Sequence, residues 1–94
     1  MGTVRKNIIE ALQGRVLTAR EISGEIGISE KEVASHLPHI HRSLARRGQK
    51  LVVTPSRCLE CGYTFKNHNR FKKPSRCPKC KSERLEPPRF SCRQ

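Results

Sequence analysis

Two Cys-x-x-Cys pairs constrain this chain more than any other feature of its sequence. The first pair is Cys58 and Cys61, the second is Cys77 and Cys80, and fifteen residues separate them. This spacing is typical of a zinc ribbon, in which four thiolates surround one tetrahedral metal ion. Nothing at the N-terminus resembles a secretory signal, so a metal site in a reducing cytosol is favoured over disulfides.

The segment that carries the cysteines is poor in apolar side chains. Residues 58–94 hold six sizeable ones: Leu59, Tyr63, Phe65, Phe71, Leu85 and Phe90. A structural Zn²⁺ contributes an apparent binding energy of roughly 10–16 kcal/mol in small zinc peptides, more than so small a core can add. We therefore expect Zn²⁺ to hold this half of the chain together, although a tetrahedral four-sulfur site also accepts iron.

The net charge of +12 comes from 20 Lys and Arg residues against eight Glu residues. Residues 1–50 hold nine basic and five acidic groups, a net of +4, whereas residues 51–94 hold eleven and three, a net of +8. This one-sided excess favours a polyanionic partner such as nucleic acid over a merely solubilising surface. No apolar run approaches the roughly 20 residues needed to cross a bilayer, so we expect a cytoplasmic protein without a membrane span.

The first fifty residues carry three helical patterns. Apolar residues at helical spacing predict a first helix over residues 3–13, and Gly14 is suited to end it. A second helix over residues 19–26 begins at a capping box formed by Thr18 and Glu21.

A further capping box, formed by Ser29 and Glu32, starts a third helix shortly after Gly27 breaks the second. Two helices joined by so tight a turn predict a helix-turn-helix. Pro38 should kink the third helix or make it restart near Leu37. Our candidates for DNA contacts on the exposed face of this helix are Lys31, Ser35, His39, Arg42 and Arg46.

The second half of the chain has the pattern of a β-hairpin with a metal knuckle at its tip. We expect a strand over residues 50–54, a returning strand over residues 62–66 and a third strand from residue 83 to residue 90. The loop between the knuckles is basic and suited to phosphate contacts, with Arg70, Lys72 and Lys73 as candidate DNA-binding residues. The fifth cysteine, Cys92, is expected to be a free thiol near a frayed C-terminus.

The run from Glu21 to Leu37 resembles the helix-turn-helix of prokaryotic winged-helix regulators. Its continuation into Cys58-x-x-Cys61-Gly-Tyr63 resembles predicted archaeal transcriptional regulators that fuse a winged-helix domain to a rubredoxin-like zinc ribbon. The resemblance implies an α+β fold, with a helix-turn-helix core over residues 1–50 and a wing extended into the ribbon over residues 51–94. Lys81 stands where rubredoxins have glycine, which predicts either backbone strain or a different turn.

The leading hypothesis is a DNA-binding transcriptional regulator with a structural four-cysteine metal site and double-stranded DNA as its partner. The alternative is an adaptor whose ribbon docks on a protein of a transcription or RNA-processing assembly. Rubredoxin-like electron transfer and redox sensing stay open. Helix-turn-helix regulators commonly dimerise, so a homodimer through the first helix or a strand edge is a further option. Catalysis is not expected, because a closed four-sulfur site leaves no position for water or substrate.

Overall fold

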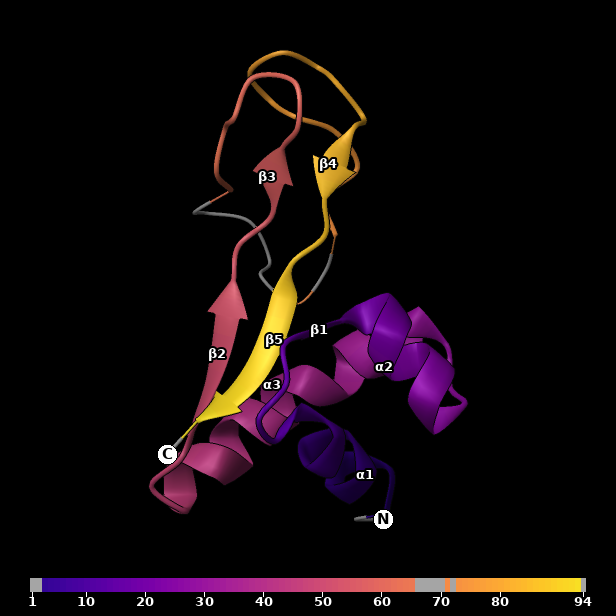
Figure 1. Cartoon of the computed structure of the whole chain (residues 1–94), viewed down its shortest axis with the longest axis vertical. Coiled ribbons are helices and arrows are strands. Elements are labelled where there is room, and N and C mark those ends of the chain that lie inside the picture. Colours follow the sequence, from indigo (N-terminus) through magenta and orange to yellow (C-terminus); the bar gives the residue numbers. More distant parts are fainter. Residues whose placement is uncertain (1–2, 66–70, 72, 94) are drawn as a thin grey trace.

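The computed structural model of this chain of 94 residues describes residues 3–65, 71 and 73–93. These residues form helices and strands in the order α1 (Thr3–Leu12), β1 (Leu17–Thr18), α2 (Ala19–Ile26), α3 (Glu30–Arg46), β2 (Lys50–Thr54), β3 (Arg57–Cys58), β4 (Leu85–Glu86) and β5 (Arg89–Arg93). The class is therefore α+β, with short antiparallel strands (Figure 1).

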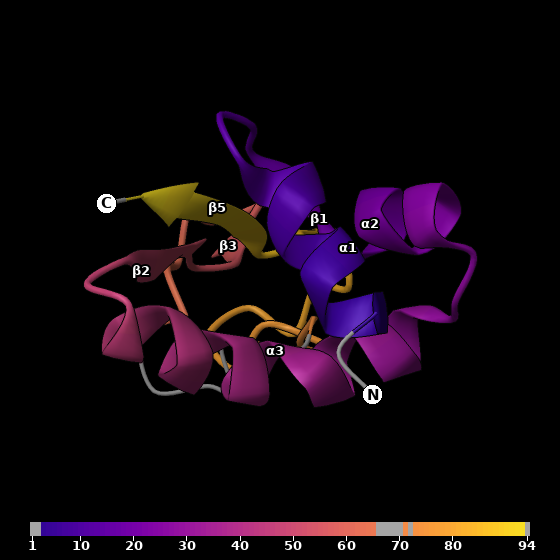
Figure 2. The same cartoon turned by 90° about the horizontal axis from the view of Figure 1, so that it is seen from below.

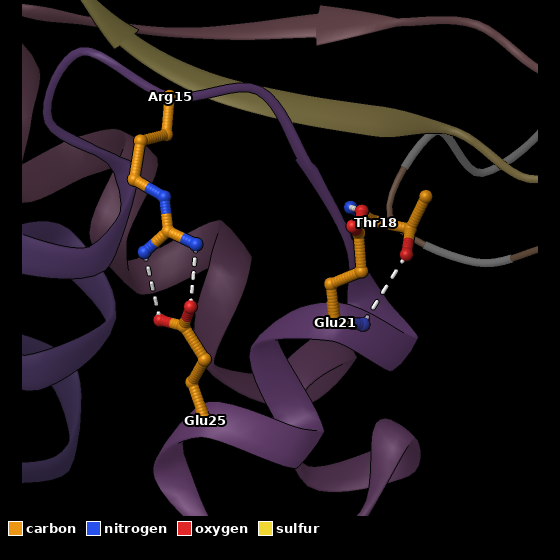
Figure 3. A network of polar contacts seen from close by, with 4 residues as sticks. All are labelled: Arg15, Thr18, Glu21 and Glu25. Carbon is orange, nitrogen blue, oxygen red and sulfur yellow. Dashed lines mark hydrogen bonds and ion pairs between the residues drawn. The ribbon is translucent and has the colours of Figure 1, made fainter.

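Local capping sets the starts of α2 and α3, with the predicted capping box complete at Thr18 and Glu21 but reduced to the Ser29 side-chain cap at the start of α3. The amide of Glu21 donates to the hydroxyl of Thr18 at 3.2 Å, and the amide of Thr18 donates to the carboxylate of Glu21 at 2.9 Å (Figure 3). At the start of α3, the amide of Glu32 donates to Ser29 Oγ at 3.1 Å. Gly27 ends α2 in the left-handed conformation, with φ of 83°. The Thr18 and Ser29 side chains satisfy amides that the first helical turn leaves without a partner, and the amide of Gly27 donates to the carbonyl of Ser23 at the end of α2.

Helix α3 continues through Pro38 as a single helix, so of the two predicted effects of Pro38, a kink or a restart near Leu37, the restart is wrong. The side chains of Val33, Leu37, Ile40 and Leu44 are all fully buried. These residues lie on both sides of the proline and belong to one hydrophobic core. Proline has a backbone φ that suits a helix and removes only one amide donor, so packing of the shared apolar face outweighs the local disruption.

The partner of β2 is the last strand, β5, and the predicted returning strand over residues 62–66 is wrong. The three-stranded sheet has the order β1-β5-β2, and Leu51 lies opposite Cys92. The described part of residues 62–66 folds back onto residues 56–58 instead, where Phe65 N donates to Ser56 O at 3.0 Å. Residue 66 lies outside the described residues.

The predicted strand over residues 83–90 is divided in two by a pair of prolines. Residues 85 and 86 form β4, which pairs with β3, and β5 begins at Arg89 and pairs with β1 and β2. Pro87 and Pro88 lie between the two strands and have no amide hydrogen to donate to a ladder. The chain therefore changes from one sheet to the other at this point.

Two hydrophobic cores result. The larger core packs the three helices against one face of the sheet and includes Phe90, which is fully buried. The smaller core contains Cys58, Phe65, Cys77 and Leu85. We call the first unit, residues 3–54 with β5, the helical module, and the described residues from 55 to 88 the ribbon.

Cys92 lies in the larger core, so its predicted place at a frayed end is wrong. Its residue is 7% exposed, and Gln13 Nε2 donates to its Sγ at 3.2 Å. Pairing of β5 with both β1 and β2 holds this part of the chain in the centre of the sheet.

The ribbon extends beyond the ends of β2 and β5 and away from the helices (Figure 1), in a molecule that measures 40 × 27 × 20 Å. In Figure 2, α3 runs along one side of the molecule; the β2 and β5 strands lie beside its C-terminal half, and α2 lies beside its N-terminal half. None of the helices in the described part of the chain is long and apolar enough to cross a bilayer.

Candidate metal centre and nucleic-acid interface

The four predicted ligands lie together at the far end of the ribbon. The sulfurs of Cys58, Cys61, Cys77 and Cys80 all lie within 4.8 Å of one another. Two of these separations, 3.5 Å from Cys58 to Cys80 and 3.6 Å from Cys61 to Cys77, cross between the pairs. A regular tetrahedron with Zn–S bonds of about 2.3 Å has sulfurs about 3.8 Å apart. The donor set therefore fits one tetrahedral ion, and sulfur donors alone do not separate zinc from iron.

The two knuckles share one backbone design. In the first, the amide of Gly62 donates to the carbonyl of Cys58 at 3.0 Å, and in the second the amide of Lys81 donates to the carbonyl of Cys77 at 2.9 Å. The amide of the first cysteine in each pair also donates to the carbonyl five residues further on, at 2.8 Å in both knuckles. These bonds hold each pair of sulfurs on the same side of its turn.

Lys81 adopts the conformation that the first knuckle gives to glycine. Its φ is 65°, close to the 78° of Gly62. Of the two sequence-based alternatives, strain or a different turn, the structure has the first. A side chain in the left-handed region is disfavoured, so the hydrogen bonds of the second knuckle and its cysteines must offset this strain.

The environment separates the pKa values of the crowded thiols. A hydrogen bond from the amide of Cys61 lowers the pKa of Cys58 to about 7. Burial raises the pKa of Cys77, but backbone hydrogen bonds from its own knuckle outweigh burial and lower it overall. The amide of Ser82 lowers the pKa of Cys80, but burial and the three neighbouring sulfurs outweigh it and raise the pKa to about 12. Four thiolates repel one another at this distance, and a divalent cation would remove the repulsion.

Strand pairing brings the two knuckles together. Cys58 lies opposite Leu85 in the β3–β4 pair, and the amide of Leu59 donates to the carbonyl of Arg84 at 2.9 Å. Tyr63 packs edge-to-face on Phe65, with ring centroids 5.1 Å apart. The cluster is small, so a bound ion would supply the cross-link that these few contacts lack. A site closed by four sulfurs suits a structural role.

The predicted contact residues on α3 lie on one exposed face. Their spacing places them along a single stripe, opposite the buried apolar face of the helix. All of them are exposed: Lys31, Ser35, His39, Arg42 and Arg46. The hydroxyl of Ser35 donates to the carbonyl of Glu32 at 2.7 Å, so it is already used within the helix. Glu30 and Glu32 are also exposed in the first turn and reduce the positive charge there.

The loop residues predicted to contact DNA are only partly described. Arg70 and Lys72 lie outside the described residues. Lys73 is exposed, and it lines the same groove as Lys31 of α3. Arg20, at the second position of α2, lines this groove too and was missed from sequence. No periodic or local signal marks it, because the other cations of the groove, Lys31 and Lys73, lie on different segments of the chain.

The fold and the four-sulfur site define a helical module that carries a rubredoxin-like zinc ribbon. Residues 3–52 match the family model "PF0610-like, N-terminal", and residues 55–94 match the "PF0610 rubredoxin-like zinc beta-ribbon domain". The chain belongs to this PF0610-like family.

One solved structure supports this assignment over nearly the whole chain. It is the solution NMR structure of protein PF0610 from the archaeon Pyrococcus furiosus, which is 35% identical and superposes with a TM-score of 0.83. The match covers 99% of this chain and 90% of that chain. No curated protein matches this sequence.

Proposed function

We propose that this protein is a DNA-binding transcriptional regulator of the winged helix-turn-helix class. The observation that carries the proposal is the exposed stripe of α3, where Lys31, Arg42 and Arg46 form no ion pair with any described residue. Cations without a carboxylate partner are available to phosphates, and Arg side chains can also read guanine in the major groove.

The arrangement of the neighbouring elements supports this assignment. Helix α3 follows α2 after a turn of three residues, Gly27 to Ser29, which suits the second helix of a helix-turn-helix. The antiparallel pair of β2 and β5 lies beside the C-terminal half of α3 (Figure 2), where a wing would contact the adjacent backbone. In this proposal the ribbon is an extension of the wing, and its metal is structural.

Fluorescence anisotropy tests the proposal with the metal-loaded chain and labelled duplex fragments of its own genome. The measurement is repeated across a salt series, because each phosphate contact changes the slope of log Kd against log salt by about 0.9. We expect Arg42→Ala and Arg46→Ala to reduce the slope by about one each. Arg84→Ala is the matched control, since Arg84 lies in the ribbon and pairs with Glu60 at 3.1 Å. Affinity that does not depend on salt would overturn the proposal.

The second candidate is an adaptor that docks through its ribbon on a protein partner. The specific observation in its favour is Leu59, which is 57% exposed within the first knuckle. Chemical cross-linking in native lysate, followed by nuclease treatment, separates the two functions. A single protein that is retained after nuclease and lost with Leu59→Ser favours the adaptor. Loss of every partner after nuclease favours DNA.

A further inference from the structure

A groove of about 660 Å³ lies between the helical module and the ribbon. One wall comes from the first turns of α2 and α3, with Arg20 and Lys31, and the other comes from the ribbon, with Phe71, Lys73 and Pro88. The volume lies within the range of about 300–1,000 Å³ that is usual for small-molecule sites. The position between two units is also usual for such sites.

The charge of the groove suits an anion. Arg20, Lys31 and Lys73 are exposed on its walls, and none of them forms an ion pair with a described residue. Among the described lining residues, Glu30 is the one carboxylate, so the local balance is three cations against one anion. Three cations drawn from three separate segments can converge on one phosphate or carboxylate group.

The rest of the lining offers flat apolar surface. The Phe71 side chain is half-buried, and its ring is stacked on that of Phe90, with centroids 6.5 Å apart and an interplanar angle of 21°. Since Phe90 belongs to the main core, the Phe71 ring is held in place from beneath. Pro87 and Pro88 add two rigid rings. Such surfaces favour a planar ring, because nucleic-acid bases commonly stack on aromatic side chains in protein complexes.

We propose that this groove binds a phosphate-bearing molecule with a planar ring, that is, a ligand of nucleotide chemistry. The ligand contacts both units and therefore links the orientation of the ribbon to that of α3. The same chemistry is present in a free nucleotide and at the end of a nucleic-acid strand, and the experiment below distinguishes the two. The proposal does not depend on duplex binding by α3.

The test is a titration of the full, metal-loaded chain with adenosine 5′-monophosphate in the absence of duplex DNA. The titration is monitored by ¹H–¹⁵N NMR. Adenosine and inorganic phosphate are titrated separately, and a short 5′-phosphorylated single strand provides the fourth arm. We expect the amide signals of Arg20, Lys31 and Lys73 to shift in a saturable way as adenosine monophosphate is added. Adenosine alone and phosphate alone should each bind at least tenfold more weakly than the nucleotide. If the strand binds more tightly than adenosine monophosphate, the site recognises strand ends. If the strand binds more weakly, the site recognises free nucleotides. Both results support the proposal.

Three outcomes would overturn the proposal. The first is no saturable shift below about 1 mM adenosine monophosphate, which corresponds to a very weak site. The second is equal affinity for inorganic phosphate and for the nucleotide, since the ring would then add nothing to the binding energy. The third is a set of shifts scattered over basic residues outside the groove.

Matched variants test the location. Lys73→Gln removes a cation of the groove, and Ala34→Leu narrows the groove without a change in charge. We expect each to weaken nucleotide binding at least tenfold. Lys79→Gln, in the second knuckle, removes the same charge at an exposed position away from the described lining and should leave binding unchanged. Equal weakening by Lys73→Gln and Lys79→Gln would mean unspecific attraction. The assay contains no duplex, so its failure leaves the DNA-binding proposal standing.

Discussion

At the scale of single residues, the two knuckles differ most clearly at the position after the second cysteine of each pair. Gly62 and Lys81 take the same left-handed backbone conformation and donate equivalent hydrogen bonds to Cys58 and Cys77. Glycine adopts this conformation freely, whereas lysine pays a conformational penalty. The second knuckle therefore depends more strongly on its metal ligands to keep its shape.

Replacement of Lys81 by glycine should relieve this strain. We expect Lys81→Gly to raise the free energy of unfolding of the metal-loaded protein by about 1 kcal/mol, net of the greater flexibility of glycine in the unfolded chain. Urea denaturation monitored by Tyr63 fluorescence would measure the change. Lys79→Gly is the control, because it removes the same charge without relief at a left-handed position. An equal effect of both substitutions would show that charge, not backbone strain, is responsible.

A second prediction at this scale concerns the ion pair between Arg15 and Glu25 (Figure 3). The Arg15 guanidinium donates to both carboxylate oxygens, at 3.0 and 2.5 Å. These hydrogen bonds hold the pKa of Glu25 below its ordinary value, although burial opposes them. Because the folded pKa is the lower one, the pair stabilises the fold above the unfolded pKa, and this contribution disappears as the pH falls through the folded pKa.

Removal of the cation should therefore raise the pKa of Glu25. We expect this rise in Arg15→Gln and no change in Arg20→Gln, with the carboxyl carbon followed by ¹³C NMR across an acid titration. The Arg15 side chain is 48% exposed and the Glu25 side chain is 40% exposed, so solvent screens the pair and global stability at neutral pH should change little. An unchanged pKa in Arg15→Gln would mean that the pair does not persist in solution.

At the scale of elements, signals close together in sequence predict the helices, but not the partners of the strands. Each cap of α2 and α3 joins residues three positions apart, and the bounds of α2 agree with the prediction. The partner of Leu51 is Cys92, which lies beyond the whole ribbon. Hairpin rules favour the nearest available strand, and residues 62–66 are much nearer to β2 in sequence than β5 is.

The same distinction applies to the candidate sites. The four metal ligands could be found from sequence because each pair is local and the chemistry of thiolates is specific. The exposed stripe of α3 follows from the helical period. The groove could not be found, because Arg20, Lys31 and Lys73 meet only through tertiary packing.

The role of β5 leads to a prediction about its central side chain. Phe90 is fully buried in the helical module, although it follows the ribbon in sequence. We expect Phe90→Ala to destabilise the protein by about 3–5 kcal/mol, as is usual for a buried phenylalanine. Urea denaturation followed by the helical circular dichroism signal measures this loss.

The control for this prediction is Leu59→Ala, at a residue that is 57% exposed. It should change stability by less than about 0.5 kcal/mol. The placement of β5 in the centre of the sheet would be contradicted if Phe90→Ala destabilised only the ribbon and left the urea unfolding transition of the helices unchanged.

At the scale of the whole molecule, the helical module and the ribbon differ in how far their own hydrophobic cores stabilise them. The helical module has a core of many apolar side chains, whereas the hydrophobic core of the ribbon consists of four buried residues, two of which are candidate metal ligands. The ribbon lies between β2 and β5, so both of its ends are held by paired strands. Loss of the metal would turn the ribbon into a longer flexible loop, and loop length adds only slowly to the entropy of closure. The sheet should survive that change.

Metal removal tests this account most directly. Native mass spectrometry should find one metal ion per chain, and ¹H–¹⁵N NMR then follows complete chelation. We predict that the amide signals of Tyr63, Phe65 and Leu85 collapse to unfolded positions, while those of Ile8 and Ile40 stay where they were. Ribbon signals that do not move after the metal is gone would contradict the central claim that four sulfurs and one ion hold the ribbon together.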